Sequence, residues 1–330
     1  MTAAQKPVVS AIIPTHNRPQ LLARAIQSVI AQTFTDWELI VVQNGRTRKS
    51  EAVVLSFNEP RIRYLYELQA GAVNARNMGI RASQGKYVAF LDDDDEWLPE
   101  KLARQVAILD QRPEISLVGC RALRMNADGQ VFDEAADFRG EPTFRAFVAE
   151  WGIIIHSLSA VLIRRTAFDA VGLFDPAYLI ANDYDLYLRL SRRFRCVSIQ
   201  EPFFRYRRHA GPMGNLSNQR ERMVEEVIAI LNKTQPSRTL GVSRRTIGER
   251  IAKFHYLRAS DCLDVGEVRQ AAGAFAQAVR HDPLIGSKMG WGRSAHRSYQ
   301  ILKPYLAIVY CLVRGLRVGK SSQDVVASRG

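Results

Sequence analysis

The sequence predicts an α/β fold with a mostly parallel central sheet flanked by helices, followed by a helical C-terminal extension. Over residues 8–91, short apolar runs of strand length alternate with stretches of helical periodicity. This alternation is typical of parallel sheets joined by right-handed crossovers. From about residue 221 the pattern is helical. The chain has 330 residues, 47% of them apolar, which is enough to bury a large core.

The first third of the chain contains the clearest elements. Helical spacing of apolar residues predicts one helix that begins at Pro19, with Asn17 as its N-cap, and another that runs from Gly71 to Gly85. The expected buried strands are 8–13, 38–42 and 87–91, with a weaker strand toward an edge at 61–66.

The apolar pattern of the second third is less regular. We expect helices from Pro99 to about Gln111 and over 182–193. The expected strands are 115–123, 159–163, 196–199 and 203–206. A hairpin turn is expected at 126–129, and a loop with a short helix over 133–158. Breaks in the pattern place a boundary near 215–240. The prediction is therefore a first domain over 1–220 and a basic helical region over 221–330, with a tetratricopeptide-like helix pair at 254–283.

Charge is unevenly distributed along the chain. Residues 1–204 hold 24 basic and 24 acidic side chains, whereas residues 205–330 hold 22 basic and 9 acidic ones, so the whole net charge of +13 belongs to the second segment. Such a segment suggests nucleic acid or an anionic membrane as a partner. We expect no nucleic-acid binding, because the segment lacks interleaved aromatic residues and any recognised motif.

Several classes of protein are disfavoured by what the sequence lacks. The four cysteines are far apart and have no zinc-like spacing, which argues against a disulfide scaffold or a structural zinc site. No apolar run is long enough to span a bilayer, and the N-terminal run at 8–13 is too short for a signal peptide. We therefore expect a cytoplasmic protein. Neither GxGxxG after a strand nor GxxxxGK[ST] occurs, so dinucleotide and P-loop folds are excluded.

Polar residues follow three of the predicted strands, and the carboxyl ends of parallel strands form the usual ligand crevice of such sheets. The strongest of these signals is the run Asp92–Asp95 directly after a buried strand. Four consecutive carboxylates repel one another, and a hard divalent cation with oxygen ligands relieves that repulsion. Mg²⁺ or Mn²⁺ in such a place typically also bridges substrate phosphates.

Four segments of the chain, spanning about residues 8–215, resemble a known family. They are VSAIIPTHNRPQLLARAIQSVIAQTFTDWELIVVQNG, AGAVNARNMGIRASQGKYVAFLDDDDEWLPEKL, GLFDPAYLIANDYDLYLRL and FRYRRH. In these segments the chain resembles a family 2 glycosyltransferase of the GT-A, Rossmann-like fold. The resemblance implies an inverting enzyme that moves a sugar from a nucleotide-sugar donor, most simply a UDP-sugar, to a hydroxyl of a glycan or lipid-linked acceptor in surface polysaccharide, glycan or glycolipid synthesis.

The resemblance also implies roles for particular residues. Asp94 matches the metal-binding position of the DxD motif, with Mn²⁺ or Mg²⁺ as the cofactor, and Asp92 would hold the ribose or support the metal. His209 would be a further metal ligand or a contact of the diphosphate. The remaining donor-binding positions are Asp93, Arg76, which would face the phosphates, and the segment beneath the nucleotide, Thr15, His16, Asn17 and Arg18.

Two positions depart from the family pattern. The family usually has an acidic residue that reads the base after the second strand, where this chain has Gln43, which could still pair with a base edge. Because Gln43 lacks the usual negative charge, the choice among UDP-, GDP- and dTDP-linked donors stays open. The family usually shows Glu-Asp where this chain has Asn182-Asp183. Asp183 matches the expected general base, and Asp185 is the competing carboxylate. These departures leave open an alternative function, a catalytically degenerate sugar-nucleotide binder or scaffolding protein.

The end of the chain suggests membrane attachment. Residues 298–318 combine apolar residues with basic ones. Such a helix can lie in the interface of an anionic bilayer, although an ordinary packed helix with a charged face has the same pattern. We therefore expect peripheral association with the inner face of the membrane.

Overall fold

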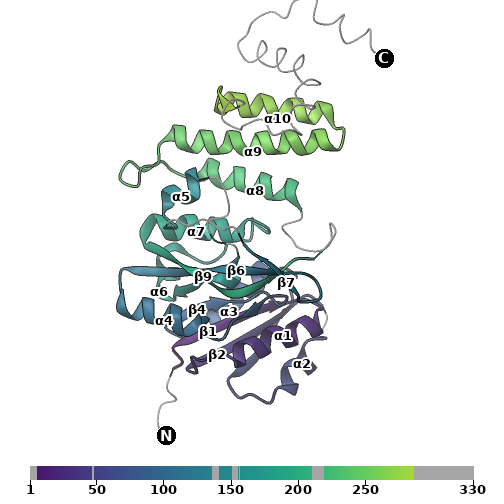
Figure 1. The fold of residues 1–330 in the computed structure, drawn as a ribbon, viewed down its shortest axis with the longest axis vertical. Coiled ribbons are helices and arrows are strands. Elements are labelled where there is room, and N and C mark those ends of the chain that lie inside the picture. The colour runs from purple at the N-terminus through teal and green to yellow at the C-terminus, as the bar shows by residue number, and fades with distance from the viewer. Residues whose placement is uncertain are drawn as a thin grey trace, which may run out of the picture. The chain divides into compact units, whose positions relative to one another are not determined.

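The computed structural model describes residues 6–46, 48–135, 141–150, 155, 157–209 and 219–285 (Figure 1). The chain divides into two compact units, Met1–Gln219 and Arg220–Gly330. The first unit is an α/β unit built on a sheet, and the described part of the second unit is helical.

The sheet of the first unit has the strand order β3-β2-β1-β4-β8-β6-β9-β5, and β7 pairs with β6. Strands β3, β2, β1 and β4 are parallel to one another, as are β6 and β9, whereas β8 pairs antiparallel with both β4 and β6. The strands are β1 Val9–Thr15, β2 Trp37–Asn44, β3 Ile62–Glu67, β4 Tyr87–Phe90, β5 Glu96–Trp97, β6 Ile115–Met125, β7 Val131–Glu134, β8 Leu162–Arg164 and β9 Arg195–Arg207. The predicted α/β class with a mostly parallel sheet is confirmed.

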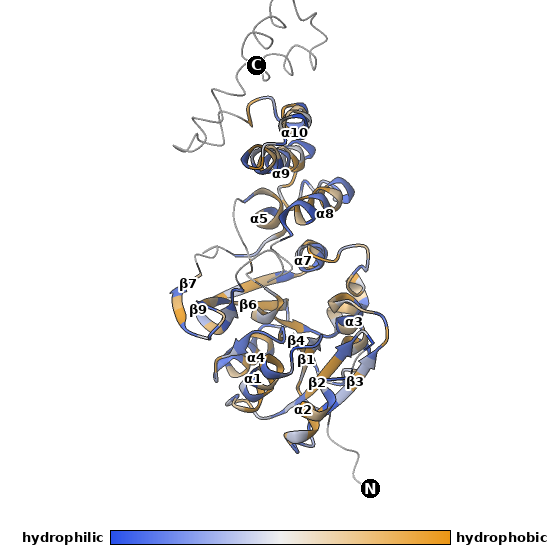
Figure 2. Cartoon of the chain, turned by 90° about the vertical axis from the view of Figure 1, so that its right-hand side faces the viewer, coloured by the Kyte–Doolittle hydropathy of each residue, from blue (hydrophilic) through white to orange (hydrophobic). Residues whose placement is uncertain are grey.

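Helices cover both faces of this sheet because its central strands are apolar on both sides. Every residue of β1 and β2 is buried, the pattern expected of a parallel strand enclosed by helices. Helix α3 (Ala72–Ala82) lies on one face, while α1 (Pro19–Ile30) and α4 (Lys101–Gln111) lie on the other (Figure 2). Gly79 of α3 sits so close to Ile12 that an added Cβ would lie 2.5 Å from a methyl group of Ile12. The absence of a side chain there lets α3 pack directly on β1.

Some predicted boundaries were wrong for identifiable reasons. Asn17 is not the N-cap of α1: its φ is +56°, the cap position is Arg18, and no side chain caps the helix. Helix α3 ends at Ala82, with Ser83 as its C-cap, rather than at Gly85, and Ser83 Oγ donates to the Ile80 carbonyl. The two strands expected at 196–199 and 203–206 form one long strand, β9, whose register with β6 shifts near Pro202.

The remaining elements of the first unit connect or cover the strands. The strand expected at 159–163 is a 3₁₀ turn, η1 (Leu158–Ala160), followed by β8. The 126–129 hairpin turn is present between β6 and β7, where the Gly129 N–H donates to the Asn126 carbonyl. The short helices are α2 Glu51–Ser56, α5 Phe144–Ala149 and α6 Thr166–Val171, and the longer α7 is Asn182–Arg193.

The second unit begins with three helices, α8 (Arg220–Lys233), α9 (Arg244–Asp264) and α10 (Val268–His281). Small side chains of α10, including Ala274 and Ala278, are buried in clusters with residues of α9, so a helix pair does form where one was expected, although α9 begins ten residues earlier. In the part of the chain that the structure describes, no helix is long and apolar enough to cross a membrane. The predicted interfacial helix at 298–318 lies outside the described residues.

A buried arginine joins β9 to the loop that follows β4. Arg207 is fully buried, and its backbone N–H donates to Asp95 Oδ1 at 2.9 Å while its Nε donates to the Asp94 carbonyl at 2.9 Å. Its Nη2 pairs with Glu96 at 2.8 Å, and its Nη1 donates to the Ala127 carbonyl at 2.9 Å. Arg207 therefore holds the acidic run against β9 and the hairpin turn.

Replacement of Arg207 by leucine should be strongly destabilising, because Glu96 and several carbonyl groups would lose a buried partner. We expect the free energy of unfolding to fall by roughly 3–5 kcal/mol, the usual cost of breaking a buried pair. Chemical denaturation of the full chain measures it. Arg208→Leu is the matched control, because Arg208 is exposed and should change stability by no more than about 0.5 kcal/mol. Equal effects of the two substitutions would contradict this role.

Candidate functional site

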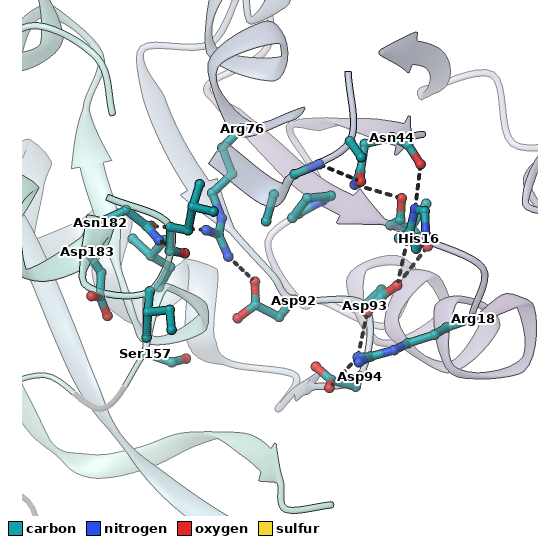
Figure 3. Close-up of a pocket in the computed structure, with 18 of the residues that line it drawn as sticks. His16, Arg18, Asn44, Arg76, Asp92, Asp93, Asp94, Ser157, Asn182 and Asp183 are labelled. Carbon is teal, nitrogen blue, oxygen red and sulfur yellow. Dashed lines mark hydrogen bonds and ion pairs between the residues drawn. The ribbon is translucent and has the colours of Figure 1, made fainter. Parts of the chain in front are cut away.

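A cavity of about 470 Å³ opens at the carboxyl ends of β1, β2 and β4 (Figure 3). Three of the segments that line it follow β1, β2 and β4, and others come from α3, from η1 and from the start of α7. The lining residues are Pro14, Thr15, His16, Arg18, Asn44, Ala70, Gly71, Ala72, Arg76, Asp92, Asp93, Asp94, Ser157, Leu158, Leu179, Ile180, Asn182, Asp183 and Tyr206. The crevice thus lies where the strand ends predicted it.

The acidic run does not point in one direction, because each of its carboxylates has different partners. Asp95 is turned into the protein, where it accepts from Ser159 Oγ at 2.7 Å and from the Arg207 N–H. Burial, followed by the charges of Asp94 and Asp92, raises the pKa of Asp95 well above its ordinary value. Asp95 does not line the cavity. It anchors the turn, and Asp92, Asp93 and Asp94 face the cavity.

Asp93 is held by the segment that follows β1. Its Oδ2 accepts from Thr15 Oγ1 at 2.8 Å and from the His16 N–H at 3.3 Å. Burial and the neighbouring charge of Asp94 raise its pKa to about 6, against the opposing effects of Arg18 and these hydrogen bonds. These hydrogen bonds fix the distance between the end of β1 and the acidic run.

Asp94 lies between two cationic or potentially cationic groups. Its Oδ2 accepts from Arg18 Nη1 at 2.7 Å and lies 3.0 Å from His209 Nε2. Burial opposes ionisation, but the hydrogen bond with His209 and the charge of Arg18 prevail and lower the pKa of Asp94. Asp94 is therefore an ionised carboxylate that faces the cavity, which is the state that a cation ligand requires.

The Asp94–His209 pair fits a divalent cation only in part. Two ligands at right angles on Mg²⁺ or Mn²⁺ lie roughly 3 Å apart, which matches the separation of these two atoms. The carboxylate oxygen suits Mg²⁺ and Mn²⁺, whereas imidazole is the more usual ligand of Zn²⁺, Cu²⁺, Fe²⁺ and Ni²⁺. Among the described residues, however, no group of three or more acidic, histidine or cysteine side chains could hold a metal. A cation here would need further oxygen ligands from the substrate, as is common for Mg²⁺.

Arg76 on α3 lines the cavity, and its side chain points toward Asp92 (Figure 3). Its Nη2 pairs with Asp92 Oδ1 at 2.6 Å, and its Nη1 donates to Asn182 Oδ1 at 3.1 Å. The side chain is only 8% exposed, and its Nε has no partner among the described residues. Arg76 is thus a nearly buried cation with a donor to spare beside the acidic run.

Asp183 occupies the first turn of α7 on the side of the cavity away from Asp94 (Figure 3). Its Oδ1 accepts from the Tyr184 N–H at 2.7 Å. Burial raises its pKa to about 6, and the charge of Asp92 adds to this effect, while the Tyr184 hydrogen bond and Arg76 oppose it. A carboxylate with a pKa near the working pH can both take up and release a proton.

Asp185, the competing carboxylate, has a structural partner instead. Its Oδ2 accepts from Arg189 Nη2 at 2.7 Å. That guanidinium also donates to the Val171 carbonyl at 2.6 Å and to the Leu173 carbonyl at 2.9 Å. Asp185 does not line the cavity, because a residue two positions along a helix points to another side.

Two of the predicted donor-binding residues are not brought into the cavity. Neither Asn17 nor Gln43 lines it. Gln43 is fully buried within β2, where its Nε2 donates to the Asn44 carbonyl at 3.0 Å. Asn44, the last residue of β2, lines the cavity instead, and its side chain links the Thr15 carbonyl to the Gly71 N–H, both at 3.0 Å.

The comparisons with known proteins identify the class of protein that has this α/β sheet, a glycosyltransferase of the GT-A fold. The family described as glycosyl transferase family 2 matches residues 10–172. An uncharacterized glycosyltransferase of Rickettsia prowazekii is 31% identical over 227 residues, which cover 65% of this chain and 69% of the relative. The chain belongs to glycosyltransferase family 2.

Two relatives have more specific names. The putative colanic acid biosynthesis glycosyl transferase WcaA of Escherichia coli is 32% identical over 190 residues, 56% of this chain and 66% of that protein. WfgD of Escherichia coli, named as a UDP-Glc:α-D-GlcNAc-diphosphoundecaprenol β-1,3-glucosyltransferase, is 36% identical over 103 residues, 31% of this chain and 41% of that protein.

Solved structures share the fold at low identity. Staphylococcus aureus TarS 1–349 in complex with UDP-GlcNAc has a TM-score of 0.64 and 17% identity, over 96% of this chain and 93% of that one. The mannosyltransferase PcManGT of Pyrobaculum calidifontis, in complex with GDP-Man and Mn²⁺, has a TM-score of 0.57 and 17% identity, over 93% and 86% of the two chains. Both likenesses establish the GT-A architecture.

The raised pKa of Asp183 predicts a stability cost at neutral pH. Between about pH 4 and pH 6 the folded protein keeps a proton that the unfolded chain has released, so stability falls as pH rises through this window. Asp183→Asn should remove this cost and raise the free energy of unfolding by roughly 1–3 kcal/mol at pH 7.5. The gain should shrink as pH falls toward 4.

Urea denaturation at several pH values, without nucleotide or metal, measures this gain. Asp185→Asn is the matched control and should lose stability at pH 7.5, because it removes the ion pair with Arg189. A stability change of Asp183→Asn that does not vary with pH would contradict a buried, protonatable carboxyl group.

Proposed function

We propose that this protein is an inverting, metal-dependent glycosyltransferase that moves a sugar from a UDP-sugar to a hydroxyl of a lipid-linked or polysaccharide acceptor. The observation that carries the proposal is the placement of Asp183 on one side of a cavity whose other side holds the ionised Asp94. An inverting transfer needs a base on the face of the sugar opposite the departing diphosphate, and these two carboxylates suit those two positions.

In the proposed reaction the donor sugar lies between Asp183 and the acidic run. The acceptor oxygen bonds to the anomeric carbon as the bond from that carbon to the diphosphate oxygen breaks, and Asp183 takes the hydroxyl proton. The negative charge leaves with the nucleoside diphosphate. No covalent enzyme intermediate is required, because attack and departure occur on opposite faces.

The phosphates of the donor are proposed to lie near Arg76 and Arg18. Arg76 has a free Nε–H among the described residues, and Arg18 is partly exposed beside Asp94. A guanidinium presents donors in a geometry that matches phosphate oxygens. Asp94 and His209 would hold Mn²⁺ or Mg²⁺, which when bound supplies neutralisation of the diphosphate charge. The Mn²⁺ named with PcManGT supports this choice of cofactor.

The proposed classes of donor and acceptor are taken from the names of similar proteins. WfgD is named for a UDP-sugar and a diphosphoundecaprenol acceptor, TarS is named with UDP-GlcNAc, and WcaA is named for the biosynthesis of a polysaccharide. PcManGT is named with GDP-Man, so a screen of UDP-, GDP- and dTDP-sugars for metal-dependent hydrolysis tests the nucleotide. Activity with GDP-sugars alone would contradict the proposed donor. Metal-dependent binding of UDP without hydrolysis or transfer would favour the degenerate binder.

Asp94→Asn should abolish metal-dependent turnover. The amide keeps the shape of the side chain but loses the negative charge that attracts the cation, and Arg18 and His209 lose their ionic partner. We expect hydrolysis of the preferred donor to fall by at least about 10², the scale of losing an electrostatic group in a reaction site. EDTA should inhibit the wild-type protein to the same extent. Unchanged metal-dependent hydrolysis in the variant would disprove the site.

Asp183→Asn should separate catalysis from donor binding. The cavity and Arg76 remain, so the affinity for UDP should stay within about twofold of wild type, while transfer or hydrolysis falls by about 10² or more. Calorimetry with UDP and Mn²⁺ measures the first quantity, and steady-state assays measure the second. Wild-type rates in the variant would mean that another residue is the base. A loss of UDP affinity as large as the loss of rate would mean that Asp183 has a structural role.

We also propose peripheral attachment to an anionic membrane through residues 298–318. Each basic residue near an anionic surface contributes about 1 kcal/mol, so a few of them, with an apolar stripe, give weak and salt-sensitive binding. Full-length protein should co-sediment with phosphatidylserine-containing vesicles at low salt, and high salt should release it. Protein truncated after residue 295 should bind less. Identical binding of both forms would disprove the role of this segment.

A further inference from the structure

Asn182 is a neutral residue in contact with a nearly buried cation. Its Oδ1 accepts from Arg76 Nη1 at 3.1 Å, and its own Nδ2 donates to the Leu179 carbonyl at 2.8 Å. The side chain is buried at the start of α7. These two hydrogen bonds fix the amide, so Asn182 in turn fixes the orientation of the Arg76 guanidinium.

Arg76 therefore has one carboxylate partner and one amide partner. Asp92 supplies a negative charge at 2.6 Å, whereas Asn182 supplies only a dipole. A carboxylate at position 182 would reach the same guanidinium and would place Arg76 between two negative charges. The asparagine orients Arg76 without neutralising it a second time.

Asp183 is the titratable group that this difference affects. Arg76 from α3 and Asp92 from the turn after β4 act on it with opposite signs, and Tyr187 from its own helix α7 is the other titratable side chain that interacts with it. Burial already disfavours the charged form of Asp183, and Arg76 is the cation that offsets this burial. A further negative charge beside Arg76 would weaken that offset.

We propose that Asn182 is a positioning residue that aims Arg76 at the cavity while leaving its charge available, and that this charge keeps Asp183 in its ionised, proton-accepting form. The inference deepens the proposed function and rests on it for its catalytic meaning. Its physical content is an electrostatic effect of position 182 on Asp183 through Arg76. It rests on the hydrogen bond between Asn182 and Arg76 and on the charge that Arg76 exerts on Asp183, and it can be measured without turnover.

The sharpest test compares Asn182→Glu with Asn182→Gln, because the two new side chains have the same shape and differ in charge. Full-length protein labelled with [¹³C]carboxyl-aspartate is titrated by NMR without metal or nucleotide, and the Asp183 resonance is assigned by its loss in Asp183→Asn. We expect the titration midpoint of Asp183 to be about one pH unit higher in Asn182→Glu than in Asn182→Gln, the scale of one nearby like charge. Equal midpoints would overturn the proposal.

A second variant keeps the test decisive if Asn182→Glu fails to fold. Arg76→Gln removes the cation itself and should also raise the Asp183 midpoint above that of wild type. An unchanged midpoint in this variant would show that Arg76 does not act on Asp183, and it would overturn the proposal as well.

The pH dependence of donor hydrolysis links this effect to catalysis. In Asn182→Glu the acidic limb of the kcat profile with the preferred donor should move upward by the same amount, whereas in Asn182→Gln it should not move. A merely structural role would lower kcat at every pH without moving the limb. Absence of hydrolysis in the wild-type protein at all pH values would count against the proposed function, and the NMR comparison would still decide the electrostatic inference.

Discussion

The site depends on the burial of one carboxylate, Asp95, at the end of the acidic run. Four neighbouring carboxylates cannot all face the same cavity without strong mutual repulsion. The fold avoids this by turning Asp95 inward, where Ser159 Oγ and the Arg207 N–H donate hydrogen bonds to its carboxylate. With that residue fixed, the run bends, and the other three carboxylates leave the turn in different directions.

Each of those three carboxylates is met by a different part of the chain. Asp92 meets Arg76 of α3, Asp93 meets the segment after β1, and Asp94 meets Arg18 and His209. An opposite charge or a hydrogen-bond donor therefore lies beside each of these carboxylates, which is the condition for keeping charge in a partly buried place. The same contacts make the cavity asymmetric, with an ionised, cation-attracting side at Asp94 and a proton-exchanging side at Asp183.

Much of this arrangement could be predicted from the sequence. The parallel strands, the crevice at their ends and the acidic run follow from apolar periodicity and from the rule that ligands bind beyond the carboxyl ends of strands. The choice of Asp183 as the expected general base came from the resemblance to family 2. The pattern could not show which face of the strand its last residues point to. Gln43 was therefore expected at the cavity, where Asn44 lies. The pattern also could not reveal Arg207, because an arginine in a strand of mixed exposure gives no sign that all its donors will find buried carbonyl and carboxylate oxygens.

The contacts of Arg207 and His209 with the acidic run join residues that are more than a hundred positions apart in the chain. During synthesis, the first hundred residues leave the ribosome with the acidic run complete but with neither of these partners yet made. Contacts of such large sequence separation form late, because the chain entropy lost in closing the loop must be recovered from them. Assembly of the cavity is therefore coupled to completion of the whole α/β unit, and a nascent chain that has only its first four strands lacks the partners that hold the acidic run in place.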